Sequence, residues 1–324
     1  MTNTLDLEWT GERYLPWLDG MAAGAYEHWH RYIYAAHFVK NKKVLDIACG
    51  EGFGSSYLSQ FAQSIVGIDL DSKSIEHARK AYGNKGQLNF LVGSMLQIPI
   101  VESNAFDVVV SFESIEHIEN PDIFLREVKR VLKPKGVFIV STPNKAIYTD
   151  KFHVQNPFHF REYYQDEFHD LIKKFFDQVV VLGQNVSPTS NIWALSKTIP
   201  NDHLVVFEDV VVKESSGFIP IESSRKTPFF FIAVATNDSN IVNTPSAYMI
   251  DDSRELFAEK DKILFNAIQE KDSEILQRDW KLADQDVRLK ARIEELESIY
   301  GSKGWKMLMF FRKIRDTIPF LRKS

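Results

Sequence analysis

The sequence predicts an α/β fold: a doubly wound, Rossmann-like sheet of seven mostly parallel strands, followed by a long C-terminal helical extension. Three observations predict it. Apolar segments typical of strands alternate with helical patterns from about residue 42. A glycine-rich turn joins the first of these strands to the helix that follows it. Beyond residue 250 the alternation gives way to a charged segment of helical periodicity.

Seven short apolar runs are predicted to be strands, and the segments between four pairs of them have helical periodicity. The strands are expected at residues 43–48, 64–69, 88–93, 106–112, 137–141, 178–182 and 229–236, and the helices at 54–61, 72–82, 121–132 and 165–176. Three consecutive valines, Val108 to Val110, indicate a strand buried on both faces. Pro134–Lys135–Gly136 is expected to stop the helix before the fifth strand.

Composition and charge divide the chain into four regions. We predict an N-terminal cap over residues 1–40, a main domain over 41–240 with an insertion at about 184–227, a long charged helix over 251–300 and a basic tail over 303–324. The tail carries a formal charge of +6 and the rest of the chain −11. Because a nucleic-acid-binding face needs a basic track, the acidic body argues against a nucleic-acid partner.

The cellular compartment is predicted from what the sequence lacks. The single cysteine, Cys49, excludes an internal disulfide and fits a reducing compartment. The N-terminal residues have no apolar core of a secretory signal, and no apolar run is long enough to span a bilayer. We therefore expect a cytoplasmic protein, with peripheral contact at the inner face of the membrane as an option.

The first strand leads into Gly50, Gly52 and Gly54, a G-x-G-x-G turn. Glycines at such a turn let the backbone bend sharply and approach a ligand closely. Asp69 ends the second strand, where a carboxylate can accept hydrogen bonds from the ribose hydroxyls of a nucleoside. The dinucleotide fingerprint is G-x-G-x-x-G, and Ser55 stands where its third glycine would be. Asp46, four residues before the first glycine, would suit a cationic sulfonium ligand.

This turn, the segment F-D-V-V-V-S-F-E-S-I-E-H ending at residue 117 and the segment L-K-P-K-G-V-F-I-V-S-T-P-N ending at residue 144 resemble the motif series of class I S-adenosylmethionine-dependent methyltransferases. The resemblance implies S-adenosylmethionine as cofactor. It places the cofactor against these residues: Asp46, Ala48, Gly50, Gly52, Asp69, Leu70, Ser94, Met95 and Phe112. The family often has an aspartate at the end of the third strand, and here Ser94 or the backbone must replace it.

His117 follows the fourth strand and is the candidate general base, with Glu116 beside it. Glu113, Glu116 and His117 form E-x-x-E-H, which is similar to metal-binding segments of 3-demethylubiquinone O-methyltransferases and of methyltransferases that modify the 3′ ends of small RNAs. That similarity implies a Mg²⁺ or Mn²⁺ site completed by His159. The alternative is that Glu116 and His117 only shape the end of the strand. Tyr26, His159 and Arg161 are candidate substrate contacts.

Several segments together resemble bacterial methyltransferases of O-antigen and surface polysaccharide biosynthesis that carry a C-terminal helical, coiled-coil extension. They are G-E-R-Y-L-P, Y-E-H-W-H-R-Y, S-T-P-N and N-P-F-H-F-R-E. This resemblance implies O-methylation of a sugar hydroxyl or phosphate of a glycan or glycolipid. Two alternatives remain: a small-molecule or quinone O-methyltransferase, and a non-catalytic scaffold that keeps the fold.

The C-terminal region has two candidate interaction elements. Apolar residues repeat every seven positions from Ile268 to Leu296, but only three of the seven companion positions between Phe257 and Ile299 are apolar. A coiled coil and a solvated single helix both fit this pattern. In the tail, apolar residues at spacings of three and four between Trp305 and Ile318 alternate with lysines and arginines. The tail is predicted to contact a membrane, a partner such as a glycosyltransferase, or its own domain.

Overall fold

The computed structural model describes residues 14–16, 22–100, 102–154, 156–187, 210–214, 217–222, 226–239, 244–247, 249 and 255–317. The chain divides into two units, Met1–Asp252 and Ser253–Ser324, and each is described by itself. Parts of three predicted regions lie outside the described residues. They are residues 1–13 and 17–21 of the N-terminal cap, residues 188–209 of the insertion and residues 318–324 of the basic tail.

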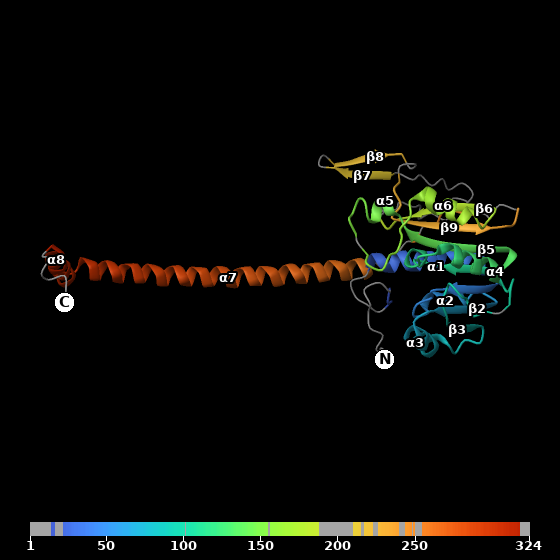
Figure 1. The fold of residues 1–324 in the computed structure, drawn as a ribbon, viewed down its shortest axis with the longest axis horizontal. Helices are drawn as coiled ribbons and strands as arrows, with labels where there is room; N and C mark the ends of the chain where they lie inside the picture. Colours follow the sequence, from blue (N-terminus) through green and yellow to red (C-terminus); the bar gives the residue numbers. More distant parts are fainter. Residues whose placement is uncertain are drawn as a thin grey trace, which may run out of the picture. The chain divides into compact units, whose positions relative to one another are not determined.

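The first unit is built on a seven-stranded sheet with the strand order β3-β2-β1-β4-β5-β9-β6, which confirms the predicted fold class (Figure 1). All neighbouring strands are parallel except β9, which runs antiparallel to β5 and β6. The strands are β1 (Lys43–Ile47), β2 (Ser64–Asp69), β3 (Leu88–Val92), β4 (Phe106–Ser111), β5 (Leu132–Pro143), β6 (Gln178–Gln184) and β9 (Phe230–Thr236).

Helices cover the sheet and bury apolar side chains against it. They are α1 (Ala22–Val39), α2 (Phe53–Leu58), α3 (Ser72–Tyr82), α4 (Pro121–Val131), α5 (Lys145–Tyr148) and α6 (Gln165–Lys173), with a short 3₁₀ turn η1 (Ile115–His117). Figure 1 shows α3 beside β2 and β3 at one end of the sheet, and α6 beside β6 and β9 at the other. Helix α4 is amphipathic: Phe124, Leu125, Val128 and Val131 are buried in the main core cluster.

The sheet topology gathers chain from distant parts of the sequence at one edge. The parallel strands β1, β2, β4 and β5 all end at this edge. Because β9 is antiparallel, its first residue, Phe230, pairs with Pro143 at the end of β5 and with Gln184 at the end of β6. Open parallel α/β sheets bind ligands at the carboxyl ends of their strands. The loops at this edge are therefore where a site is expected.

Helices α1 and α5 were not among the predicted helices, and β5 and the predicted insertion also differ from the sequence-based prediction. Strand β5 begins at Leu132 and runs through Pro134–Lys135–Gly136, because an irregularity in its pairing with β4 between Phe106 and Val108 accommodates these residues. The hairpin of β7 (Val210–Glu214) and β8 (Gly217–Ile221) forms inside the predicted insertion as a separate two-stranded sheet.

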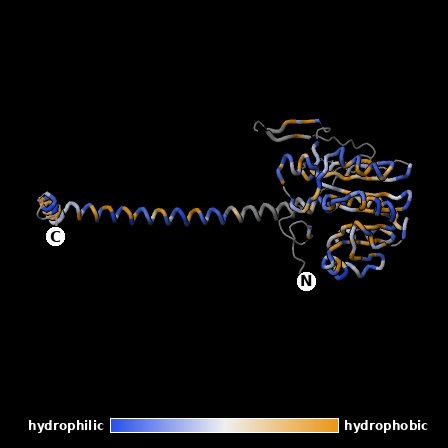
Figure 2. The backbone as a smooth tube through the Cα atoms, viewed as in Figure 1, coloured by the Kyte–Doolittle hydropathy of each residue, from blue (hydrophilic) through white to orange (hydrophobic). Residues whose placement is uncertain are grey.

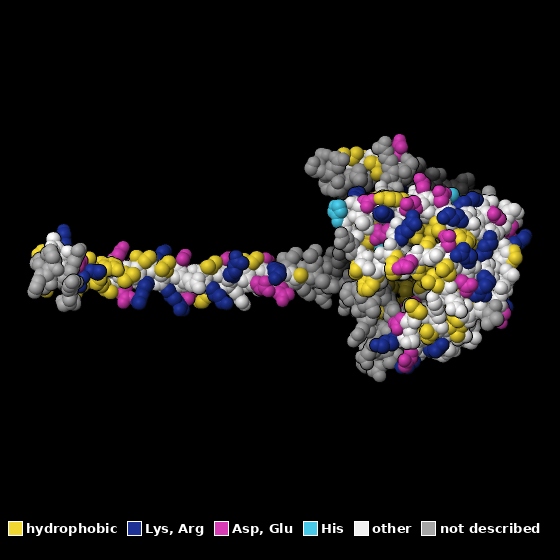
Figure 3. All heavy atoms as spheres, in the orientation of Figure 1, with side chains coloured by type: hydrophobic (Ala, Val, Ile, Leu, Met, Phe, Trp, Pro, Cys, Tyr) yellow, Lys and Arg dark blue, Asp and Glu magenta, His cyan; other side chains and the backbone are white. Residues whose placement is uncertain are grey.

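The second unit consists of α7 (Glu255–Gly301) and α8 (Lys303–Thr317). Every described side chain of α7 is exposed, and Figures 2 and 3 show apolar residues interspersed with charged ones along its length. The heptad residues Ile275, Leu282, Leu289 and Leu296 are 43–60% exposed. Self-association through this helix stays a prediction. Within the described residues, none of the helices combines the length and the apolarity that crossing a bilayer would need.

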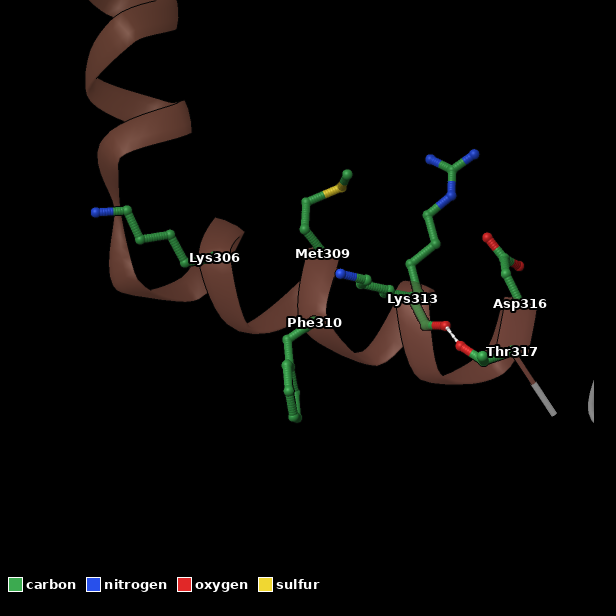
Figure 4. Close-up of a pocket in the computed structure, with 7 residues that line it drawn as sticks. Lys306, Met309, Phe310, Lys313, Asp316 and Thr317 are labelled. Carbon is green, nitrogen blue, oxygen red and sulfur yellow. Dashed lines mark hydrogen bonds between the residues drawn. The ribbon is translucent and has the colours of Figure 1, made fainter.

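Helix α8 carries basic and apolar side chains together, all of them exposed or nearly so. Lys306, Met309, Phe310 and Lys313 line one open surface hollow on the helix (Figure 4). Figure 4 also shows Met309 and Phe310 pointing to opposite sides of the helix axis, so its apolar side chains are spread widely around it. The membrane or partner role of this tail remains a prediction.

Candidate active site

The loop after β1 contains three residues in left-handed backbone conformations. Gly50 has φ 57° and Gly52 φ 93°, and Ala48 adopts φ 57° although it has a Cβ. A Cβ at Gly52 would come within 2.8 Å of Ala78 and of the Phe90 ring. Glycine at position 52 is therefore required both by backbone conformation and by packing.

Asp69, at the end of β2, ties this loop to the neighbouring strand. Its Oδ2 accepts a hydrogen bond of 2.8 Å from the Gly50 amide, and its Oδ1 accepts one of 2.9 Å from the Asp71 amide. Each carboxylate oxygen has a further lone pair for a ligand hydroxyl. The next residue, Leu70, is 74% exposed and offers an apolar surface at the same edge. This pairing is the arrangement expected for a ribose with an adenine beside it.

Asp46 has hydrogen-bond partners within the protein. It is fully buried, and its carboxylate accepts hydrogen bonds from Ser55 Oγ at 2.6 Å and from the Tyr32 hydroxyl at 3.2 Å. A carboxylate enclosed in this way stabilises the conformation of the glycine loop through its hydrogen bond from Ser55. In this structure the carboxylate supports the loop through Ser55 and Tyr32, and its contact with the methionine part of the cofactor stays a prediction.

Burial raises the pKa of Asp46 from 3.8 to about 7, against the lowering effect of the bonds from Ser55 and Tyr32. The folded protein therefore binds a proton that the unfolded chain releases, so this carboxyl loses stabilising effect as pH rises from about 4 to 7. Thermal or urea unfolding measures the unfolding free energy of the wild type and of Asp46→Asn. The difference between the two should fall by on the order of 2–4 kcal/mol as the pH rises from about 4 to 7. An unchanged difference would contradict the raised pKa.

Gly54 lies on the buried side of α2 under the Tyr32 ring. A Cβ at this position would overlap the ring atoms of Tyr32. Overpacking of this kind costs about 1–3 kcal/mol, so Gly54→Ala should lower the unfolding free energy by at least about 2 kcal/mol. Gly86→Ala is the matched control, since a Cβ there meets nothing within 4 Å. Equal melting temperatures for the two variants would show that the α1–α2 contact is looser than this structure has it.

The remaining predicted cofactor residues lie on two sides of the loop. Ser94 follows β3, and its Oγ accepts the Leu96 amide at 3.1 Å, while Met95 packs partly buried against the core cluster. Phe112 follows β4 and is buried, with its ring 5.1 Å from that of Tyr32 in an edge-to-face contact. Ser94 thus uses its hydroxyl to shape its own turn, and an adenine contact from it remains a prediction.

The segment after β4 carries the candidate catalytic residues. Glu113 has a left-handed φ of 48°, and it exchanges hydrogen bonds with Ser141 of β5 through its amide (3.0 Å) and its Oε1 (2.6 Å). His117 Nδ1 lies 3.1 Å from the carbonyl oxygen of Phe158. Because a carbonyl only accepts, this contact places the ring proton on Nδ1 and a lone pair on Nε2. Nε2 is therefore the atom of His117 that can accept a proton.

Glu116 and His159 stand next to His117. Glu116 is fully buried: its Oε2 accepts a bond of 3.1 Å from Thr142, and its Oε1 has no hydrogen-bond partner among the described residues. Burial, reinforced by the nearby Glu113 carboxylate, raises the pKa of Glu116 well above its ordinary value. The His159 ring centroid lies 4.9 Å from that of His117, and its Nδ1 donates to Glu162 at 2.8 Å.

Three of the four predicted metal ligands come together. Potential ligand atoms of Glu116, His117 and His159 all lie within 4.8 Å of one another. Glu113 is outside this group, because its carboxylate is bonded to Ser141 and lies 3.5 Å from the Arg31 guanidinium. Glu113 is therefore not placed as a metal ligand in this structure. The carboxylate oxygen of Glu116 without a partner among the described residues and the two imidazoles are a suitable donor set for a divalent ion.

Comparison with known proteins identifies the kind of domain that contains this site. Residues 45–140 match a family model described as a methyltransferase domain. This segment is a methyltransferase domain. The matched segment contains the glycine loop, Asp69 and the E-x-x-E-H segment, and it ends in β5.

Relatives of the methyltransferase domain cover about half of this chain or less. A protein of Mycolicibacterium smegmatis named a probable S-adenosylmethionine-dependent methyltransferase is 35% identical over 51% of this chain and 63% of its own length. A ubiquinone biosynthesis O-methyltransferase of Pelagibacter ubique is 35% identical over 34% of this chain and 45% of its own length. The chain thus spans less than two thirds of these relatives. Among solved structures, the PH0226 protein of Pyrococcus horikoshii aligns with a TM-score of 0.46 at 20% identity, over 69% of this chain and 96% of that one.

The predicted substrate contacts of the methyltransferase domain are not gathered equally. His159 belongs to the histidine pair, with its side chain only 7% exposed. Tyr26 lies half-buried on α1. The side chain of Arg161 is 57% exposed, lies 3.6 Å from Glu167 and stacks over the Tyr163 ring. These contacts turn its guanidinium toward α6, although its amide donates to the carbonyl of Glu116 at 3.2 Å, so a substrate contact of Arg161 stays a prediction.

Sequence reasoning missed the hydroxyl and amide groups that support the methyltransferase site. Ser141 and Thr142 at the end of β5 hold Glu113 and Glu116, and Asn156 holds His159 Nε2 at 3.0 Å. Helix α1, which lies within the predicted N-terminal cap, supplies Tyr32 to the buried Asp46. Ser141, Thr142 and Asn156 belong to the S-T-P-N and N-P-F-H motifs of the sequence. The hydrogen-bond partner of a small hydroxyl side chain can be identified only when the pairing of the two strands is known.

Proposed function

We propose that this chain is an S-adenosylmethionine-dependent O-methyltransferase that deprotonates its acceptor hydroxyl at His117. The observation that carries the proposal is one juxtaposition. The glycine loop after β1 and His117 after β4 lie at the carboxyl ends of two adjacent strands, and His159, from the loop between α5 and α6, packs against His117. A ligand held by the loop and an acceptor held at the histidines would therefore be neighbours, which is what an in-line transfer between two bound molecules requires.

The cofactor supplies an electrophilic methyl group on a sulfonium, and the chain's part is to hold and orient it. Asp69 would accept the ribose hydroxyls with the lone pairs left after its bonds to Gly50 and Asp71. Leu70, exposed at this edge, would cover the adenine. The left-handed Ala48, Gly50 and Gly52 let the backbone lie close to the methionine part, and Asp46 fixes the loop from beneath.

On the acceptor side, His117 Nε2 would take the hydroxyl proton. The Phe158 carbonyl fixes the ring orientation and the tautomer through Nδ1. A positioned base of this kind contributes about 10²–10⁴-fold to a rate. His159, oriented by Glu162 and Asn156, would contact the same hydroxyl or its neighbour.

Glu116, His117 and His159 would also hold Mg²⁺ or Mn²⁺, and in that case Nε2 of His117 would bind the ion instead of a proton. Two features support this alternative: the unpartnered Glu116 Oε1, and the Glu162 carboxylate that orients His159 from behind, as second-shell carboxylates do at metal sites. A bound ion would lower the pKa of the acceptor hydroxyl. The Asn156 amide would have to leave His159 Nε2 to make room.

For the acceptor, our proposal is a hydroxyl or phosphate of a glycan or glycolipid, supported by the polysaccharide-type motif set at both ends of the domain. The second candidate is a quinone-type phenol, favoured by the ubiquinone biosynthesis relative. The partners proposed for α7 and α8 are a second copy, a glycosyltransferase or the membrane surface. A cytoplasmic location, free or peripheral to the inner face of the membrane, is part of the same proposal.

Transfer of a labelled methyl group from S-adenosylmethionine to three acceptor classes tests these alternatives. The acceptors are a neutral glycoside, a sugar phosphate and a catechol, each assayed with Mg²⁺, with Mn²⁺ and with a chelator. Transfer to a glycoside or sugar phosphate would support the glycan proposal, and transfer to the catechol alone would favour the quinone class. Chelator-resistant transfer would leave His117 as the base. A well-folded protein that binds no S-adenosylmethionine would point to a scaffold.

A further inference from the structure

The loop between α5 and α6 exposes large apolar side chains next to the candidate catalytic histidines. Phe158 is 52% and Phe160 64% exposed, and Phe152 is 56% exposed in the same loop. Phenylalanine is among the residues most often buried, and a cluster of exposed apolar side chains commonly marks an interaction surface. The function of the histidines leaves these rings unexplained.

Two hydrogen bonds hold the backbone of Phe158 and Phe160 against the residues of the reaction site. The Phe158 carbonyl is the group 3.1 Å from His117 Nδ1. The Phe160 amide donates to the Glu116 carbonyl at 2.8 Å. His159, the residue between them, turns its side chain inward and is 7% exposed there, whereas both rings remain exposed. An acceptor with its hydroxyl at His117 would thus lie next to the backbone that carries the exposed rings of Phe158 and Phe160.

The charges around the rings favour an apolar ligand over an anionic surface. Arg161 is engaged by Glu167, and the Tyr164 hydroxyl donates to Asp150 at 2.9 Å. With Glu162 also in the loop, the acidic groups balance the basic ones. Peripheral membrane contacts usually need an excess of lysine and arginine. Binding of a single apolar chain requires only an apolar surface, which the exposed rings of Phe158 and Phe160 provide.

We infer that Phe158 and Phe160 receive the apolar chain of a lipid-linked acceptor, a prenyl or acyl chain joined to the group that carries the methylated hydroxyl. This inference rests on the proposed function and adds the substrate class to it. Each methylene that leaves water on such rings raises affinity by about fourfold. A chain of several carbons would therefore dominate acceptor selection, whichever hydroxyl-bearing head group it carries.

The test compares binding of octyl β-glucoside, below its critical micelle concentration, with binding of methyl β-glucoside. Calorimetry in the presence of saturating S-adenosylhomocysteine gives both affinities for the wild type and for Phe158→Ser/Phe160→Ser. The matched control is Phe61→Ser, which changes an exposed phenylalanine (39%) in the turn after α2. We expect the wild type and the control to bind the octyl compound at least about tenfold more tightly than the methyl compound, and the double variant to lose most of this difference.

Equal affinities for the two glucosides in the wild type, or an octyl preference that survives in the double variant, would overturn the inference. So would loss of binding to anionic phospholipid vesicles in the double variant with its octyl preference intact, since the rings would then serve a membrane surface. Melting temperature and S-adenosylhomocysteine affinity are measured on every variant. Failure of the wild type to bind S-adenosylhomocysteine would reject the proposed function. The ratio of the two glucoside affinities is a separate measurement, so its loss would reject only the inference about the apolar chain.

Discussion

Asp69→Ala is expected to abolish measurable binding of S-adenosylmethionine. The carboxylate holds the Gly50 amide at 2.8 Å and would also accept the ribose hydroxyls. Hydrogen bonds to a charged group contribute about 1.5–3 kcal/mol each. Loss of two such bonds, together with slackening of the loop, corresponds to a decrease in affinity of about 10²–10⁴-fold. Titration calorimetry of the full chain measures it directly.

Asp71→Ala is the control for this variant. Asp71 is two residues further on, and its carboxylate caps α3 by accepting the Lys73 amide at 3.1 Å and the Ser74 hydroxyl at 2.7 Å. Its loss should cost about 1 kcal/mol of stability and leave cofactor affinity within a few-fold of the wild type. Equal affinity losses in both variants would mean that the carboxylate of Asp69 acts only through the fold of the loop.

His117→Ala is expected to lower the rate of methyl transfer by about 10²–10⁴-fold while leaving the affinity for S-adenosylmethionine unchanged. The reason is spatial: His117 follows β4 and contacts the loop at Phe158, whereas the proposed ribose and adenine contacts lie after β1 and β2. Single-turnover assays with saturating cofactor measure the chemical step, and calorimetry measures the cofactor affinity in parallel.

His169→Ala serves as the matched histidine replacement, because His169 lies on the exposed side of α6 beside Asp170. It should keep full activity. If His117→Ala retained more than about a tenth of the wild-type rate, the proposal of His117 as base or metal ligand would be wrong. If Glu116→Gln lowered the rate of transfer and the remaining rate no longer depended on added metal, the ion-binding role of this group would be favoured over the base.

Much of the fold and of the cofactor side could be predicted from the residues alone. Strand β2, helix α3 and the start of β4 coincide with the predicted bounds, since short β-branched runs and an amphipathic helix carry their own signals. The glycine loop and Asp69 are also close in sequence to strand ends, so the parallel topology brings them together. Strand β5 was predicted to begin five residues too late, because its irregular pairing with β4 depends on a neighbouring strand.

The sequence by itself determined the alternation of strands and helices, the left-handed glycines and the candidate residues at the strand ends, because these depend on local conformation and on apolar periodicity. Only the tertiary structure decided which candidates meet. It enclosed Asp46 under Tyr32 and Ser55, separated Glu113 from the group formed by His117 and His159, and turned Arg161 toward Glu167. Such outcomes depend on side chains far apart in the chain competing for the same partners, which no local pattern records.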